Sequence, residues 1–276
     1  MPTITHAEII ARAKKIGEVC RANALETEKL RHLPKENVQA MVESDLIGLI
    51  IPKDRGGYGI DSWMVIADAV TEVGRHCGSS GWCFDLLMQH HWVFGMFPPE
   101  CQDQVYKADP RPKIGTSFMP AAKVTRAPGG FRVTGEWSFS SGIDQSDWAI
   151  LGGVVPPADA SGQPDVRFFL FGPGEFKVKD NWYAVGLKGS GSNDVLVEPT
   201  FVPEAFVYDH DLALVGKAPG HSVHDGVLYR SPLILNAGFA VMTPMHGIAR
   251  GAYEAFVDLT AGRKARPMGA KPSDKV

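Results

Sequence analysis

Two serines at the end of a strand-like pattern are the first residues whose placement suggests chemistry. The stretch TGEWSFSSGIDQSDW, residues 134–148, continues a run with hydrophobic residues at alternate positions, which is typical of a strand with one buried face. The hydrophobic residues that share this parity are Phe131, Val133, Trp137 and Phe139. Ser141 is the next residue of the same parity and would therefore lie on the buried face. A buried hydroxyl costs about 1–3 kcal/mol unless it is hydrogen-bonded. Ser141 therefore lies in a solvated turn or faces a ligand.

The histidines and cysteines do not form a recognisable metal site. His90 and His91 are adjacent, so in a helix their side chains point about 100° apart and do not share an ion easily, although one can face a pocket. HSVHD at 221–225 lies between two glycines and is more typical of a solvated loop than of a metal site. The four cysteines lack any CxxC pair, which favours reduced thiols in a cytoplasmic protein. No metal is predicted.

Composition and generic motifs exclude several classes of function. The net charge of -3 gives no electrostatic case for binding nucleic acid or an anionic membrane. LIGLIIP at 46–52 is too short to span a bilayer, and no signal peptide is visible at the N-terminus. GxGxxG, GxxxxGK[ST] and GxSxG are all absent, so a dinucleotide in a Rossmann site, a nucleotide in a P-loop and a serine-hydrolase elbow are not expected.

Periodicity predicts helices, then strands, then a helix. Helical spacing of hydrophobic residues marks residues 9–20 and 63–77, a further helix is predicted from near Pro34, and residues 79–98 are apolar enough for an interior helix. From Lys113 to Phe206, short alternating runs separated by Gly- and Pro-rich turns predict strands. A long apolar helix is expected at 231–265. This order predicts an α+β fold, with a helical domain at 1–110, a β domain at 111–225 and a helical segment at 226–276.

Three segments together resemble the acyl-CoA dehydrogenase superfamily. GLIIPKDRGGYGID (48–61), TGEWSFSSG (134–142) and GLKGSGSNDVLVEPTFVPE (186–204) resemble, in order and approximate spacing, a loop between helices, the flavin-contacting strand and the segment near the end of the β domain. The ordered set covers essentially the whole chain. The resemblance implies an N-terminal helical domain, a central β-barrel and the start of a C-terminal helical bundle.

Within that superfamily, the chain is most similar to the oxygenase components of two-component flavin-dependent aromatic hydroxylases. Its GTSFMPAAKV (115–124) lacks the acidic Gly-Ser-Asp loop of the dehydrogenases. The hydroxylase pattern W-x-F-[AS]-S-G-x-x-x-x-x-W is matched from Trp137 to Trp148, and SGW at 80–82 is followed by His90 at the hydroxylase spacing. LYRSP at 228–232 fits the same subgroup.

The resemblance implies roles for the matched residues. Ser141 is implied to hydrogen-bond flavin N5 and slow the loss of peroxide from a C4a-hydroperoxyflavin, and His90 to hold the oxygen of a small phenolic substrate and favour its phenolate. A satisfied core histidine is the alternative for His90. The residues implied to bind the flavin or line its site are Trp82, Thr116, Ser117, Phe139, Ser140, Ser141 and Arg230, Arg230 being equally compatible with a solvated helix start.

The implied cofactor is reduced FMN or FAD, delivered by a separate NAD(P)H-dependent reductase, with O₂ as co-substrate and a homotetramer as the assembly. Family members continue beyond residue 276 with further helices, so the resemblance implies a truncated bundle with an exposed apolar helix face. Two alternatives stay open. One is an acyl-CoA dehydrogenase, disfavoured because LILNAGFAV (233–241) lacks the glutamate that some of those enzymes carry there. The other is a non-catalytic flavin-fold subunit.

Overall fold

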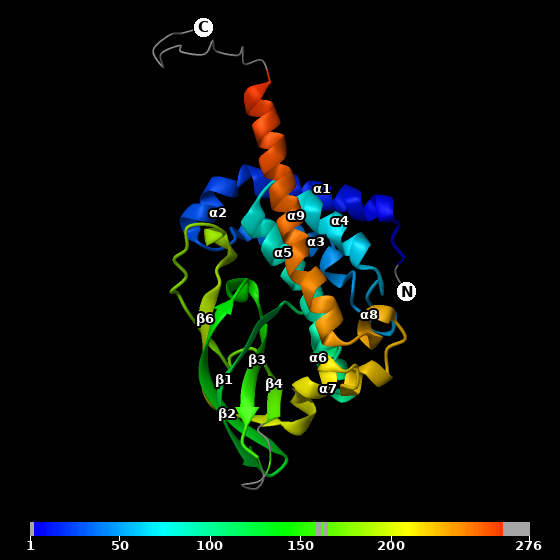
Figure 1. Ribbon diagram of the computed structural model, residues 1–276, viewed down its shortest axis with the longest axis vertical. Coiled ribbons are helices and arrows are strands. Elements are labelled where there is room, and N and C mark those ends of the chain that lie inside the picture. Colours follow the sequence, from blue (N-terminus) through cyan, green and yellow to red (C-terminus); the bar gives the residue numbers. More distant parts are fainter. Residues whose placement is uncertain (1–2, 158–161, 163–164, 262–276) are drawn as a thin grey trace.

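The computed structural model describes residues 3–157, 162 and 165–261. Helices form the first part of the chain, strands the middle and helices again the end (Figure 1). The first helices are α1 (His6–Ala22), α2 (Ala24–Leu30), α3 (Lys35–Glu43), α4 (Trp63–Gly74), α5 (Gly78–Phe94) and α6 (Pro99–Ala108). The last are α7 (His210–Leu214), α8 (Val227–Arg230) and α9 (Leu233–Thr260). The predicted α+β fold class is confirmed.

The strands form one seven-stranded sheet in the order β5-β6-β2-β1-β3-β4-β7. They are β1 (Ile114–Ala127), β2 (Gly130–Ser140), β3 (Trp148–Val155), β4 (Asp165–Phe171), β5 (Lys177–Lys179), β6 (Asn193–Pro203) and β7 (Val207–Asp209). Among the strand pairs of the described residues, β1 and β3 form the only parallel one. The sheet curls on itself, since Phe131 of β2 contacts Phe169 of β4 with ring centroids 5.6 Å apart. The predicted barrel is thus a curled sheet in which β5 and β7 are the edge strands.

Helix α5 is the centre of the helical part. It is buried on nearly all sides, as its apolar sequence predicts. It packs closely against α4 because both helices carry glycine at the contact: a Cβ added to Gly81 would lie 2.4 Å from the Cα of Gly74. His90 of α5 contacts Ile114 and Thr116 of β1 through its two ring nitrogens. Helix α5 is therefore joined directly to the sheet at this histidine.

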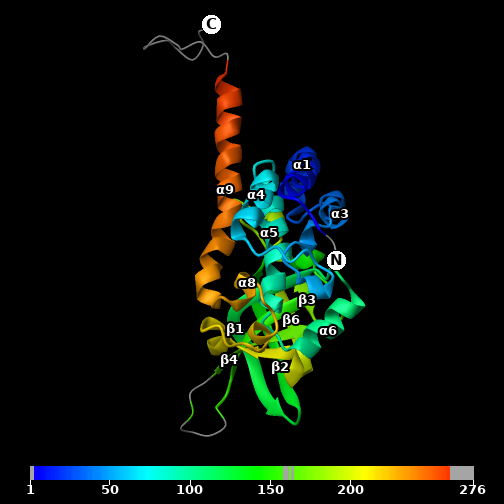
Figure 2. The ribbon, with the colours of Figure 1, turned by 90° about the vertical axis from the view of Figure 1, so that its right-hand side faces the viewer.

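Helix α9 lies along α4 and α5, and polar contacts attach it to α4 (Figure 2). Trp63 Nε1 donates to Asn236 Oδ1 at 2.7 Å, and Arg75 forms an ion pair with Glu254 at 2.7 Å. Along its length α9 also exposes apolar side chains, as the sequence predicts: Leu235, Phe239, Met242, Met245, Tyr253, Phe256, Val257 and Leu259. None of the described helices combines the length and apolar character that crossing a membrane requires.

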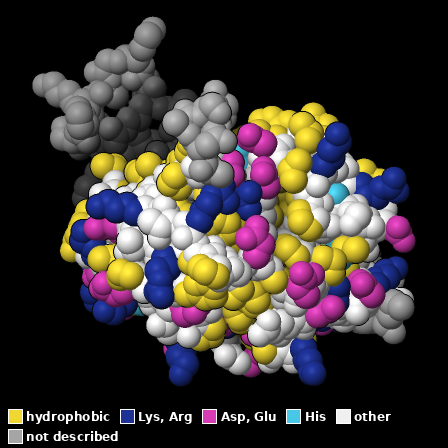
Figure 3. All heavy atoms as spheres, turned by 90° about the horizontal axis from the view of Figure 1, so that it is seen from below, with side chains coloured by type: hydrophobic (Ala, Val, Ile, Leu, Met, Phe, Trp, Pro, Cys, Tyr) yellow, Lys and Arg dark blue, Asp and Glu magenta, His cyan; other side chains and the backbone are white. Residues whose placement is uncertain are grey.

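The four cysteines are buried free thiols. Seen from below, the surface mixes hydrophobic side chains with charged groups of both signs, so this face presents no single-sign patch (Figure 3). The domain limits at 110/111 and 225/226 stay predictions, and residues 262–276 of the predicted last segment lie outside the described residues.

Candidate functional site

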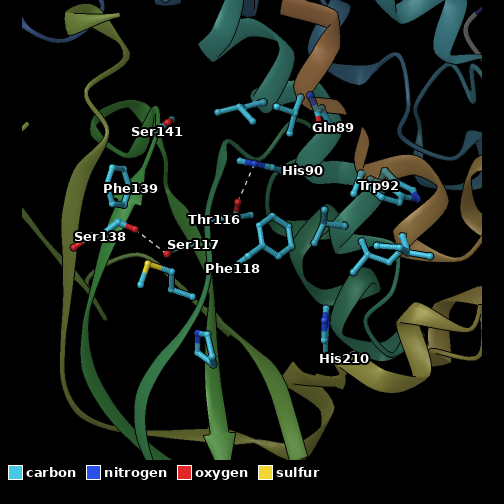
Figure 4. Close-up of a pocket in the computed structure, with 18 of the residues that line it drawn as sticks. Gln89, His90, Trp92, Thr116, Ser117, Phe118, Ser138, Phe139, Ser141 and His210 are labelled. Atoms are coloured by element: carbon cyan, nitrogen blue, oxygen red, sulfur yellow. Dashed lines mark hydrogen bonds between the residues drawn. The ribbon is translucent and has the colours of Figure 1, made fainter. Parts of the chain in front are cut away.

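A cavity of about 680 Å³ lies between the helix-facing side of the sheet and helices α5, α7 and α9. Most of its wall is apolar, with a few polar side chains from β1, β2 and α5 (Figure 4). The sequence-predicted residues on this wall are Trp82, His90, Thr116, Ser117, Phe139 and Ser141. The cavity therefore collects most of the predicted site from three distant segments of the chain.

Strand β2 reaches the cavity through a β-bulge. Trp137 pairs with Val195 and Ser140 with Asn193, so β2 has one more residue than β6 in this interval. Phe139 adopts a left-handed backbone conformation with φ of 62°. Phe139 is 65% exposed and lies on the cavity wall, whereas Trp137 points to the opposite, interior side of the sheet. The predicted burial of Phe139 on the face of Trp137 is therefore wrong, because the bulge reverses the alternation.

Ser140 and Ser141 have different environments. Ser140 is fully buried, its Oγ donates to the carbonyl oxygen of Thr116 at 3.1 Å, and it is not on the cavity wall. Ser141 is half-buried on the cavity wall, and its Oγ lies 2.6 Å from Ser192 Oγ. The solvated-turn alternative for Ser141 is therefore not what the structure shows. Ser140 instead supports the strand end and does not face the predicted ligand.

His90 is buried and hydrogen-bonded through both ring nitrogens. Nδ1 lies 2.5 Å from the carbonyl oxygen of Ile114, which can only accept, so Nδ1 carries the hydrogen. Nε2 lies 3.0 Å from Thr116 Oγ1, and in the neutral ring it accepts the Thr116 hydroxyl hydrogen. Burial lowers the pKa of His90 to about 4. His90 is therefore a neutral acceptor toward the cavity at neutral pH.

The remaining predicted residues on the wall are held by the sheet and by α5. Ser117 is buried, and its Oγ donates to the carbonyl oxygen of Ser138 at 2.9 Å. Thr116 is also buried and has its hydroxyl directed at His90 (Figure 4). Trp82 is half-buried on α5. These contacts fix the polar groups of β1 before any ligand enters.

Arg230 does not reach the cavity. It is exposed at the end of the short helix α8 and is absent from the cavity wall. The start of α8 is fixed by Asp61, whose carboxylate accepts hydrogen bonds from the backbone N–H groups of Val227 and Leu228 at 2.5 and 2.6 Å. The solvated helix-start alternative therefore describes Arg230 in this structure.

Sequence reasoning missed several residues of the cavity. His210, at the start of α7, lies on the cavity wall, and its Nδ1 is buried without a hydrogen-bond partner among the described residues. Burial lowers the pKa of His210. Phe118 of β1 lies between His90 and His210 in Figure 4, and Met119 also lines the cavity. His210 follows a short strand far from the recognised motifs, so no local pattern indicates it.

The other histidines are separate from this cavity. His224 Nε2 lies 2.8 Å from Gln102 Oε1, and His221 Nε2 lies 3.4 Å from the carbonyl oxygen of Ser231. In the part of the chain that the structure describes, no group of three or more His, Cys, Asp or Glu side chains is placed to hold a metal ion. These histidines connect loops to the helical core.

Known proteins resemble this chain in sequence and structure. The FADH₂-dependent resorcinol hydroxylase oxygenase component of Rhizobium sp. is 30% identical over 96% of this chain and 64% of its own length. The flavin-dependent monooxygenase oxygenase subunit HsaA of Mycobacterium tuberculosis is 32% identical over 96% of this chain and 67% of its own length. The crystal structure of 3-HSA hydroxylase from Rhodococcus superposes with a TM-score of 0.86 at 32% identity, covering 92% of this chain and 66% of that chain.

No protein-family model matches the chain. The chain spans about two thirds of the length of the curated relatives it matches. The identity to HsaA, together with a superposition that includes both the helices and the curled sheet, confirms the resemblance seen in the sequence. The chain belongs to the acyl-CoA dehydrogenase-like family of oxygenase components of two-component flavin-dependent monooxygenases.

Proposed function

We propose that this chain forms the flavin- and substrate-binding part of an oxygenase component that hydroxylates a phenolic compound. The observation that carries the proposal is the convergence of Ser141, His90 and Thr116 on one largely apolar cavity. Ser141 can then hydrogen-bond the edge of a flavin, and His90 can accept a hydrogen bond from a phenol, in the same cavity. Such a site needs no covalent nucleophile, because it acts by positioning its ligands and excluding water.

The residues on the sheet side fit a flavin. Phe139 offers an exposed aromatic ring to a flat ring system, and Ser141 offers a hydroxyl beside it on the same wall. Trp82 of α5 lies on the same cavity wall. Reduced flavin, when bound, supplies the electrons that activate O₂, so that one oxygen atom enters the substrate ring and the other leaves as water. The protein's part is to hold the ring edge at Ser141 and to keep water away.

His90 is proposed to receive the phenol. Its Nε2 lone pair, now satisfied by Thr116, can accept the hydrogen of a phenol when the Thr116 hydroxyl turns away. A phenol hydrogen-bonded in this way is more electron-rich at the ring carbons. The lowered pKa of His90 opposes complete transfer of the phenol proton, so the proposal is a hydrogen-bonded phenol where the sequence suggested a phenolate.

The broader assembly follows from the relatives. The resorcinol hydroxylase is named as FADH₂-dependent, which favours reduced FAD over FMN here. A separate NAD(P)H-dependent reductase is proposed as its source, since relatives carry the name oxygenase component. We further propose a cytoplasmic homotetramer, which the free cysteines and the exposed apolar side of α9 support. Among the described residues, the cavity wall includes no Asp or Glu, which disfavours the proton abstraction of an acyl-CoA dehydrogenase.

The test supplies photoreduced FAD and ¹⁸O₂ to the chain in the presence of phenols. We expect flavin binding, seen as a change in flavin fluorescence, and one ¹⁸O atom in the hydroxylated product. Ser141→Ala should release more peroxide per flavin oxidised, while the matched variant Ser140→Ala should bind flavin as the wild type does. Bleaching of bound oxidised FAD by an acyl-CoA would instead indicate a dehydrogenase. Absence of flavin binding would refute the proposal and favour a non-catalytic subunit.

A further inference from the structure

Ser141 stands at the end of a row of three serine hydroxyls. Its Oγ lies 2.6 Å from Ser192 Oγ, and Ser192 Oγ lies 2.7 Å from Ser190 Oγ. Ser190 and Ser192 are 1% and 5% exposed, and neither lies on the cavity wall. The row therefore runs from the protein interior to the cavity, with Ser141 as its only member on the wall.

The loop that carries the two inner serines is fixed against the turn that carries Ser141. The backbone N–H of Gly142 donates to the carbonyl oxygen of Ser190 at 2.8 Å. Gly191, between the two serines, has a φ of 52°, and a Cβ at this position would lie 2.4 Å from Asp144 Oδ2. Glycine therefore avoids strain at 191, and it lets the chain place the Ser190 and Ser192 hydroxyls in a row that ends at Ser141.

Counting hydrogens gives the row a direction. Each hydroxyl has one hydrogen and two lone pairs. Among the described residues, Ser190 Oγ bonds only to Ser192, and a buried donor without an acceptor is unfavourable. Ser190 therefore donates to Ser192. Within the described part of the chain, the only other partner of Ser192 Oγ is Ser141, so Ser192 donates to Ser141. Ser141 then keeps its own hydrogen and one lone pair for the cavity.

We propose that Ser190 and Ser192 form a hydroxyl relay that directs the Ser141 hydroxyl into the cavity, which makes Ser192 a positioning residue for the N5 edge of a bound flavin. The inference rests on the proposed function, because it takes flavin as the ligand of Ser141. N5 of oxidised flavin has a bare lone pair and needs a donor, whereas N5 of reduced flavin carries a hydrogen and needs an acceptor. When Ser192 donates to Ser141, the Ser141 hydroxyl can offer N5 either its own hydrogen as a donor or its remaining lone pair as an acceptor.

The test uses oxidised FAD labelled with ¹⁵N at N5 and bound to the chain. In the wild type we expect the N5 resonance to be displaced by the Ser141 hydrogen bond, and Ser141→Ala should remove that displacement. Ser192→Ala should lose at least half of this displacement of the N5 resonance, and Ser190→Ala should lose a smaller part. Ser192→Thr, which keeps a hydroxyl, should retain the displacement. Peroxide released per reduced flavin oxidised should rise about threefold or more in Ser192→Ala, as expected for a weakened hydrogen bond.

Ser146→Ala is the matched control. Ser146 lies in the same turn, but its hydroxyl donates to the carbonyl oxygen of Gly142 at 2.9 Å, outside the relay. The N5 resonance of FAD bound to Ser146→Ala should therefore equal that of FAD bound to the wild type. A wild-type resonance in Ser192→Ala, with the displacement lost in Ser141→Ala, would overturn the relay alone. A wild-type resonance in Ser141→Ala, or no FAD binding by the wild type, would overturn the proposed function and the relay with it. If Ser192→Ala does not fold, Ser190→Ala decides by the same criterion.

Discussion

Replacing His90 by glutamine should change how the stability of the protein depends on pH. The folded protein keeps His90 neutral down to a pKa of about 4, whereas the ordinary value is 6.5. Between these values the unfolded chain binds a proton that the folded chain does not. Unfolding therefore takes up a proton in this window, so stability falls as the pH falls from 6.5 toward 4.

The expected size of the stability change follows from the interval between the two pKa values of His90, about 4 in the folded protein and 6.5 in the unfolded chain. At pH 5 the unfolded histidine lies 1.5 pH units below its ordinary pKa of 6.5, and at about 1.4 kcal/mol per unit the loss is about 2 kcal/mol. Glutamine can still donate to the carbonyl oxygen of Ile114 or pair with Thr116, but it does not titrate. The stability advantage of the wild type over His90→Gln should therefore shrink by about 2 kcal/mol between pH 7 and pH 5.

Urea unfolding followed by circular dichroism at the two pH values measures this difference. Other buried groups, such as Asp85 with its raised pKa, titrate in both proteins and cancel in the comparison. His91→Gln should show a change of similar size, because burial also lowers the pKa of His91, to about 3. A wild-type advantage that stays constant, or a His90 NMR resonance that titrates near pH 6.5, would refute the neutral, buried acceptor on which its proposed role depends.

Three further changes test the rest of the site. Ser140→Ala removes the hydrogen bond to the carbonyl oxygen of Thr116 and should lower the unfolding free energy by about 1 kcal/mol, measured by urea unfolding, where an unchanged value would contradict its supporting role. Gly191→Ala, at a left-handed φ and against Asp144, should lower it by about 1 kcal/mol or more. His210 lines the cavity with an Nδ1 that has no hydrogen-bond partner among the described residues; if the proposed function holds and this atom receives a second hydroxyl of the substrate, His210→Leu should lower the ratio of kcat/KM for a dihydric phenol to that for phenol by about fivefold, as for one lost hydrogen bond, and an unchanged ratio would exclude this role.

The helices were predictable because their signal is local. Hydrophobic residues at helical spacing gave α1 and α4, and the apolar run at 79–98 gave the interior helix α5. Ser141, His90 and Trp82 came from motif spacing, and the structure brings them to one cavity. Arg230 and His210 depend on how short helices α7 and α8 pack against distant segments. No pattern along the chain encodes that packing, and these two residues were accordingly misplaced or missed.

The β-bulge in β2 explains why strand parity failed at the end of this strand. Alternation predicted that Phe139 and Ser141 lie on the face of Trp137, which is the interior of the curled sheet. The bulge places Ser138 and Phe139 on the same, helix-facing side, and Ser141 follows them to the cavity. A left-handed residue is usually glycine or asparagine, so a phenylalanine at this position gives no sequence signal. Ser141 thus lies on the cavity wall, although strand parity placed it on the wrong face; its contact with a ligand stays a prediction.

The strain at Phe139 has a structural reason. A left-handed backbone at a bulky residue costs about 1–3 kcal/mol, and hydrogen bonds on both sides of the bulge offset it: Trp137 Nε1 donates to the carbonyl oxygen of Gly152 at 2.7 Å, and Ser140 Oγ donates to that of Thr116 at 3.1 Å. A regular strand would bury Phe139 and Ser141 inside the sheet, away from α5. Only the bulge puts an aromatic ring and a hydroxyl, two residues apart, on the wall that His90 faces. The strained residue is therefore what joins the sheet's contribution to that of the helices in one site.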